Sequence, residues 1–237
     1  MWVLGMVICP LGVTLSAKAG FGVSMIEAPV YVTYLRLSQS FPKITFGTME
    51  YILQALVLIL LCILVKKLKP RYLLSFGTAV LFGLILDGWR SVLGTGLYEN
   101  TGMRIFACAA GIVTVAFAIA CFFRTDLPQE VWELFVKEYS EIKGKKMTKV
   151  KWIYDITSLT VGIILMLTLL RKFEWTAIGI GTIVTTIVNA PLIGLFGKLI
   201  DKVWKDREGV RTPFTEQQER KALEEAAKAA SEEEEEN

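Results

Sequence analysis

Five uncharged, mostly apolar runs limit how this chain can fold more than any other feature. They cover Tyr51–Val65, Tyr72–Leu86, Ile105–Phe123, Ile156–Leu170 and Thr176–Gly197, and several can be extended by a few residues. A helix of roughly 17–25 apolar residues crosses the hydrocarbon layer of a membrane. Hydrophobic residues make up 53% of the chain, more than one soluble core requires. The runs predict an all-α polytopic membrane protein.

A sixth run, Trp2–Ala17, contains Pro10. It has two interpretations. Ala17-Lys18-Ala19 resembles a signal-peptidase site, but no Lys or Arg precedes the apolar run, as a signal peptide normally requires. An internal repeat favours a retained helix, so we expect about six transmembrane helices.

The basic residues predict the orientation of these helices. One side of the membrane receives the clusters at 66–71, 124–151 and 198–207, and it carries about twice as many Lys and Arg residues as the other side. Such a bias marks the cytoplasmic side. With about six spans, both termini are then cytoplasmic.

The two halves of the chain share short matching segments. The pairs are "SFGTAV" (Ser75–Val80) with "GIGTIV" (Gly179–Val184), 104 residues apart, and "AKAGFGVSMIE" (Ala17–Glu27) with "FRTDLPQEVWE" (Phe123–Glu133), 106 residues apart. The second pair aligns Lys18 with Arg124 and Glu27 with Glu133. The order of span, short helix, span and span is therefore expected twice.

This repeat divides the chain into residues 1–100, residues 101–207 and a tail over 208–237. Three spans per repeat is an odd number, so the second copy enters the membrane from the opposite side and the repeats are inverted. The tail is rich in Glu and in helix-forming residues. It reads as a polar, acidic cytosolic segment.

Each repeat also contains a predicted short amphipathic helix. Ser24 with Glu27 and Asp126 with Gln129 have the spacing of capping boxes, which begin helices. We expect both helices to lie in the membrane interface. The acidic and basic residues expected to face water on the second helix are Glu130, Glu133, Lys137, Glu138 and Glu141.

Several of these segments together resemble a known family. They are "AKAGFGVSMIEAP", "ITFGTMEYILQ", "SFGTAVLFGLILD" and "GIGTIVTTIVNAPLIGLF", in this order over residues 1–204. They are similar to the YczE/YyaS/YitT family of bacterial integral membrane proteins. The resemblance implies a multi-pass protein of the bacterial cytoplasmic (inner) membrane. The second half departs from the pattern where "DLPQEVWE" replaces a small glycine-rich turn.

The last apolar run contains polar residues and a proline. Pro191 removes one backbone hydrogen bond, so the helix is expected to kink or break near Asn189. One interpretation is a packed kink. The other is a broken helix that lines a solute site, with Thr182, Asn189 and Pro191 along the pathway.

Carboxylates within spans are the other candidates for a solute or ion pathway. Glu50 and Gln54 are spaced i,i+4 near the start of the second span, Asp87 lies near the end of the third, and Asp155 lies near the inner end of the fifth. Ionisable groups inside a membrane are costly and mark functional sites, whereas groups near a surface can simply be solvated. Both alternatives remain open for these residues.

The sequence carries no pattern typical of an enzyme. It has no His, no phosphate-binding glycine loop and no Ser paired with a base. Cys9, Cys62, Cys108 and Cys121 lie in apolar runs without metal-ligand spacing and are expected to act as small hydrophobes. We therefore expect no catalytic residues, metal, cofactor or nucleic-acid partner.

Two functional interpretations follow from these observations. The first is a secondary transporter or permeation pathway for a small solute or ion, which the inverted repeats and intramembrane carboxylates favour. The second is a membrane scaffold or accessory protein without transport activity. In either case the lipid bilayer is the expected partner, and the oligomeric state stays open.

Overall fold

The computed structural model describes residues 1–66, 70–94, 100–125, 130–145 and 147–204, and every regular element among them is helical. The elements are α1 (Trp2–Ala19), α2 (Glu27–Ser40), α3 (Phe46–Val65), α4 (Pro70–Val92), α5 (Thr101–Phe122), α6 (Val131–Lys143), α7 (Met147–Leu165), the π-helical segment η2 (Met166–Leu170) and α8 (Ile180–Trp204). The acidic tail and the Asp126–Gln129 capping box lie outside the described residues.

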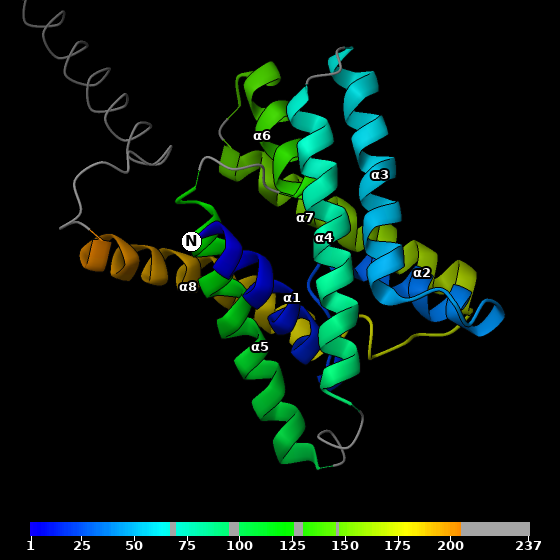
Figure 1. Cartoon of the computed structure of the whole chain (residues 1–237). Coiled ribbons are helices and arrows are strands. Elements are labelled where there is room, and N and C mark those ends of the chain that lie inside the picture. The colour runs from blue at the N-terminus through cyan, green and yellow to red at the C-terminus, as the bar shows by residue number, and fades with distance from the viewer. Residues whose placement is uncertain (67–69, 95–99, 126–129, 146, 205–237) are drawn as a thin grey trace, which may run out of the picture.

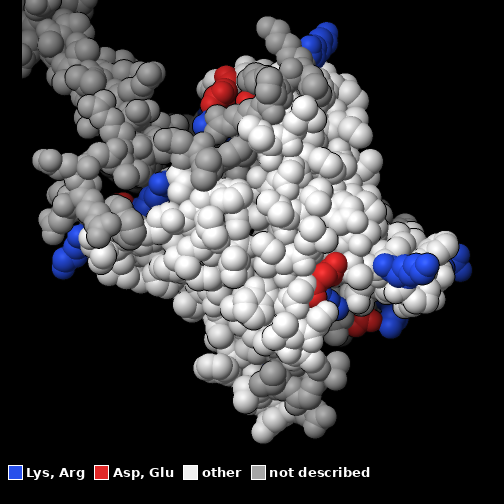
Figure 2. Space-filling model, viewed as in Figure 1, with Lys and Arg blue, Asp and Glu red and all other residues white. Residues whose placement is uncertain are grey.

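Six of these helices are long and apolar enough to cross a membrane, which confirms the predicted number of candidate spans. They are α1, α3, α4, α5, α7 extended by η2, and α8. Large apolar side chains are exposed along them; Ile187 on α8 is 67% exposed. The face drawn in Figure 2 is mostly uncharged, and its charged side chains form a few small, separate groups. An exposed apolar surface of this extent suits lipid contact.

The most extensive contact between two helices is the crossing of α1 with α5, which lie side by side in Figure 1. Gly12 and Gly111 meet there, and a Cβ atom added to Gly12 would lie 2.8 Å from the Gly111 carbonyl oxygen. Small residues allow such backbone contact, which drives helix association in lipid. Met6, Cys9 and Val13 of α1 belong to the main apolar core. The first apolar run is thus an integral part of this fold.

The short helices α2 and α6 pack inside the bundle. Each contacts α3 and α7, and the first residues of both helices are buried. Glu130 and Glu138, which were expected to face water, are 8% and 7% exposed, so that expectation was wrong. The physical reason is that both carboxylates accept hydrogen bonds from other helices, namely from Gln54 and Tyr72.

The "GIGT" segment at the start of α8 supports the loop between α1 and α2. Gly181 N donates to Phe21 O at 2.6 Å, and Val23 N donates to Ala177 O at 3.1 Å. A Cβ atom on Gly179 would lie 2.5 Å from Phe21 O, so only glycine fits. This contact explains the segment as a packing motif.

The helix α8 continues through Pro191 without a break. It packs mainly along α5, and its outer face is exposed. One lost donor does not have to end a membrane helix, because local adjustments satisfy the freed backbone. Of the kink or break expected near Asn189, the break is therefore not formed, because the helix is continuous from Ile180 to Trp204.

We predict that Gly12→Ala lowers the melting temperature of the protein in detergent. The new methyl group would lie 2.7 Å from Val115 Cγ2 and 2.8 Å from Gly111 O, and such overpacking costs about 1–3 kcal/mol. The control is Gly77→Ala, because a Cβ atom at this helical glycine meets nothing within 4 Å. Gly77→Ala is expected to keep or slightly raise the melting temperature, because alanine favours helix. Equal changes of the melting temperature in both variants would contradict the close contact of α1 with α5 at Gly12.

Candidate functional site

The candidate site begins with two polar residues on the first turns of α3. The Thr45 hydroxyl caps this helix by accepting from Thr48 N at 3.0 Å, and Glu50 and Gln54 lie on its buried face. Both side chains are completely buried. Gln54 Nε2 donates to Glu50 Oε1 at 3.0 Å, as their i,i+4 spacing suggests.

Gln54 connects Glu50 with the start of α6. Its Nε2 atom also donates to Glu130 Oε2 at 3.0 Å, and its Oε1 atom accepts from Val131 N at 3.0 Å. The indole Nε1 of Trp132 donates to Glu50 Oε1 at 2.9 Å. The Gln54 amide thus donates to two carboxylates and accepts from Val131 N at the start of α6. Backbone N–H groups in the first turn of a helix have no partner within that helix.

A third carboxyl group, Glu27 at the start of α2, completes this buried cluster. Glu27 Oε2 and Glu50 Oε2 are buried atoms with no hydrogen-bond partner among the described residues. Burial raises the pKa of Glu27 well above its usual range, and the neighbouring Glu50 and Glu130 raise it further. Burial likewise raises the pKa of Glu130, with Glu133 and Glu50 adding to the effect and the Gln54 hydrogen bond opposing it. Such groups favour their protonated, neutral forms.

The neighbouring half of the site contains a cation. Lys151 Nζ lies 3.2 Å from Asp155 Oδ1 and 4.0 Å from Glu133 Oε1. The Asp155 contact is close enough for an ion pair, although it is not aligned as a hydrogen bond. Burial raises the pKa of Glu133 and the Lys151 charge opposes this shift. Asp155 is therefore linked to the cluster through Glu133, which follows Glu130 by one helical turn.

Aromatic rings border this second half. The Trp132 and Tyr154 ring centroids are 6.4 Å apart, and those of Phe135 and Tyr154 are 5.3 Å apart. No group of His, Cys, Asp and Glu side chains within the described ranges has an arrangement that would hold a metal ion. The arrangement suits storage and transfer of protons, since carboxyls and an ammonium group adjoin in a shielded place.

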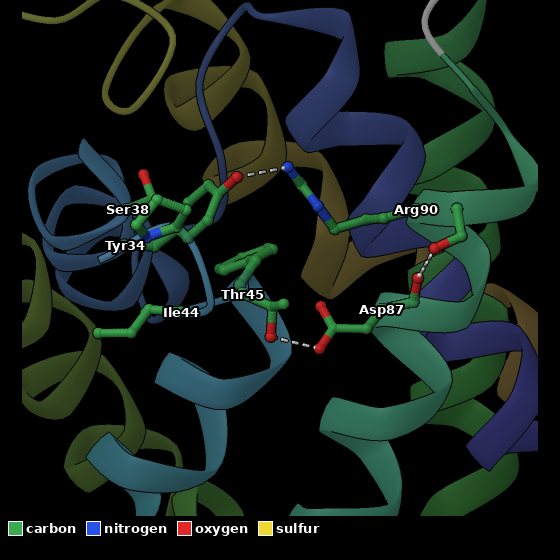
Figure 3. Close-up of a pocket in the computed structure, with 9 residues that line it drawn as sticks. Tyr34, Ser38, Ile44, Thr45, Asp87 and Arg90 are labelled. Carbon is green, nitrogen blue, oxygen red and sulfur yellow. Dashed lines mark hydrogen bonds between the residues drawn. The ribbon is translucent and has the colours of Figure 1, made fainter. Parts of the chain in front are cut away.

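Asp87 lies away from this cluster, between α4 and the start of α3. Its Oδ2 atom accepts from the Thr45 hydroxyl at 2.5 Å, and its Oδ1 atom accepts from Gly47 N at 2.9 Å. Figure 3 shows the Thr45 contact at the edge of a pocket. Asp87 thus links α4 by two hydrogen bonds to the N-terminus of α3, where a negative charge is favourable.

The three candidates on α8 also lie elsewhere. Thr182 is buried at the start of the helix, where its hydroxyl accepts from Gly179 N at 3.2 Å. Asn189 is half-buried, its Oδ1 atom has no partner among the described residues, and Pro191 is exposed. The structure therefore brings Glu50, Gln54 and Asp155 to one region and leaves Asp87, Thr182, Asn189 and Pro191 outside it.

Four residues of the cluster were not recognised as site residues from the sequence, namely Glu27, Glu130, Trp132 and Glu133. Glu27 was interpreted as half of a capping box, and Glu130 and Glu133 as part of a solvated helix face. One signal was available, because Glu27 and Glu133 align in the repeat. A matched pair of carboxylates can mark a site that both halves share.

The fold and this cluster define a polytopic helical membrane protein with carboxyl groups buried between its helices. The chain belongs to the family of unknown function DUF6198, which matches residues 1–198. It is 26% identical over 212 residues to the uncharacterized protein YyaS of Bacillus subtilis (strain 168), a match that covers 87% of this chain and 96% of that protein. The YyaS-like membership predicted from the motifs is thereby confirmed. No solved structure matches the chain.

We predict that Glu130→Gln reduces the pH dependence of stability. The pKa of Glu130 in the fold lies above the ordinary value of 4.5, so the folded protein binds more protons than the unfolded chain. The free energy of unfolding then falls as pH rises from this ordinary value through the pKa of the folded state. Glutamine keeps an acceptor for Gln54 and removes the titration. Its melting temperature should exceed that of the wild type at about pH 8, and the two should converge near pH 5.

The matched control for this experiment is Glu141→Gln, on the exposed face of the same helix. It should keep the pH dependence of the wild type. Thermal unfolding in detergent across the pH range measures all three proteins. An unchanged slope in Glu130→Gln would show that Glu130 does not titrate with a raised pKa.

Proposed function

We propose that this protein is a secondary transporter in which the buried carboxylate cluster takes up and releases protons. The observation that carries the proposal is the pair of unpartnered oxygen atoms on Glu27 and Glu50, from α2 and α3. A buried carboxylate oxygen that faces a second carboxyl group instead of a cation or donor is costly, so the shielded state favours a bound proton. Access of water from either membrane side would lower the pKa and release that proton.

We further propose that the two halves are inverted repeats and that this cluster lies between them. The packing of the helices supports the proposal. Contacts of α1 with α4, α2 with α7 and α2 with α3 have counterparts in α5 with α8, α6 with α3 and α6 with α7. The helices α1 and α5, which correspond to each other, cross directly. The close pairing of α3 with α4 is an exception, because α7 and α8 do not pack in this way.

Side chains at matching positions support the same relation. Lys18 donates to Arg90 O at 2.9 Å at the end of α4, and Arg124 binds Asp201 at 2.6 Å near the end of α8. These basic residues are the pair that the repeat aligns. The site residues also match in pairs, Glu27 with Glu133 at 106 residues and Glu50 with Asp155 at 105 residues.

The two halves of the proposed site differ in charge. Lys151 lies beside Glu133 and Asp155, whereas Phe46 occupies the matching position in the first half, 105 residues earlier. The carboxyls of the first half therefore have no lysine at the matching position, and protons are the simplest way to neutralise them. This asymmetry supports a proton-binding role for Glu27 and Glu50 in particular.

The proposed setting is the bacterial cytoplasmic (inner) membrane, with both termini in the cytoplasm. Reporter fusions after Lys69, after Lys145 and at the C-terminus are expected to read as cytoplasmic, because basic residues concentrate there. Fusions after Gln39 and Thr101 should read as external. An external signal at Lys145 would contradict both the orientation and the inverted repeats.

Transport is tested by proton movement in proteoliposomes that contain a pH-sensitive dye. Pools of small solutes are added outside, and a coupled solute is expected to change the internal pH. Glu50→Gln should abolish this change, because the amide keeps the acceptor for Trp132 and Gln54 but cannot release a proton. Glu141→Gln should retain it.

Carbodiimide labelling gives a second readout that does not require the solute. These reagents add to protonated carboxyl groups, so mass spectrometry should find Glu50 modified at neutral pH and less so at high pH. Absence of both labelling and coupled proton movement would favour the scaffold alternative. The unbroken α8 is the observation that speaks for that alternative.

A further inference from the structure

A pocket separate from the carboxylate cluster opens between the ends of α2 and α4 and the start of α3. It has a volume of about 270 Å³. Figure 3 shows Tyr34, Ser38 and Ile44 on one side and Asp87 and Arg90 on the other. Its walls thus combine aromatic and aliphatic surface with hydroxyl groups and two charges, as small-molecule sites commonly do.

The charges of Asp87 and of Lys18, which contacts the end of α4, are each compensated by a helix end. Asp87 accepts two hydrogen bonds at the N-terminus of α3, including one from Gly47 N. Lys18 donates to the carbonyl oxygens of Arg90 and Gly94 near the end of α4. Each charge therefore faces the helix terminus of opposite polarity.

The remaining charge, Arg90, lacks an equivalent partner. Its Nη2 atom donates to the Tyr34 hydroxyl at 3.1 Å, and its guanidinium carbon lies 5.1 Å and 5.4 Å from the Tyr34 and Phe46 ring centroids. Its Nη1 atom is buried and has no acceptor among the described residues. A guanidinium held by rings in this way is positioned and still has donors for a planar anion.

We propose that this pocket binds a small organic monocarboxylate, with the Arg90 guanidinium, which lines the pocket, donating to the carboxylate. The apolar body of the ligand packs against Ile44 and the Tyr34 ring, which line the pocket. Arg90 lines this pocket near the end of a membrane span, and the Asp87 carboxylate on the same wall is already bonded to Thr45 and Gly47. The guanidinium therefore favours an anionic ligand. The proposal names a substrate class for the transporter and rests on the proposed function for that role. A carboxylate carried with one proton from the buried cluster would cross without net charge.

The experiment measures binding to purified protein in detergent. Acetate, butyrate and benzoate are titrated calorimetrically, each beside its neutral primary amide. At least one acid is expected to bind, and its amide is expected to bind at least tenfold more weakly. Arg90→Gln should weaken the acid at least tenfold. The control Arg36→Gln removes an exposed arginine of α2 and should bind as the wild type does.

A second variant tests the pocket if Arg90→Gln fails to fold. Ser38→Phe fills the pocket and leaves the charges in place, and it should also weaken the acid at least tenfold. Failure of every acid to bind the wild type, or equal binding in Ser38→Phe, would overturn the proposal. Stabilisation by phosphatidylglycerol but not by the acids, dependent on Arg90, would overturn it in favour of a lipid phosphate.

The variant Glu50→Gln separates this inference from the proposed function. It should still bind the acid, because Glu50 does not line the pocket, whereas coupled proton movement should be lost. Carboxylate binding without coupled proton movement in the wild type would overturn transport and leave the pocket assigned. Proton movement without carboxylate binding would overturn the pocket assignment and leave the proposed transport function standing.

Discussion

The contact between the backbones of α1 and α5 determines where the other elements can lie. Lipid offers no hydrophobic effect between helices, so the close approach at Gly12 and Gly111 supplies packing that larger residues would prevent. Arg104 of α5 then donates to Ala19 O at 2.8 Å and fixes the end of α1. From this point a loop with Gly22 at φ 103° leads the chain onto the start of α8 and into α2. The buried position of Glu27 at the start of α2 thus depends on the α1–α5 crossing, which lies in another part of the bundle.

The buried cluster depends in turn on one neutral side chain. Gln54 donates to Glu50 and Glu130 and accepts from Val131 N, so both ends of its amide are used. An amide at this position holds two carboxyls close together without neutralising either. Hydrogen bonds to the charged form and burial of the same group act in opposite directions on protonation. This opposition keeps the carboxyl groups responsive to changes in solvent access.

Sequence reasoning predicted those parts of the molecule that depend on local composition. Span length follows from the apolar runs, and the Glu50–Gln54 pair follows from helical spacing. The role of Glu130 could not be predicted in this way, because its partner Gln54 lies 76 residues earlier. A charged residue on a short amphipathic helix normally faces water, and only the packing of α6 against α3 reverses this. The break expected at Pro191 was wrong for the opposite reason. The lost backbone hydrogen bond is a local effect, and α8 continues through it.

The helix α3 joins the two proposed binding regions. Phe46 borders the pocket at its first residue, and Glu50 lies one turn further along, about 6 Å at 1.5 Å per residue. Gly47 and Gly83 bring α3 and α4 into backbone contact, and Asp87 adds hydrogen bonds at the same level. These two helices are therefore expected to move as one unit against α2 and α6. Any displacement of that unit that changes the pocket around Arg90 also changes the distances from Glu50 to Glu27 and Trp132, because both sets of contacts cross the same boundary. A ligand at the pocket and a proton at the cluster can thus influence each other through the position of α3 alone.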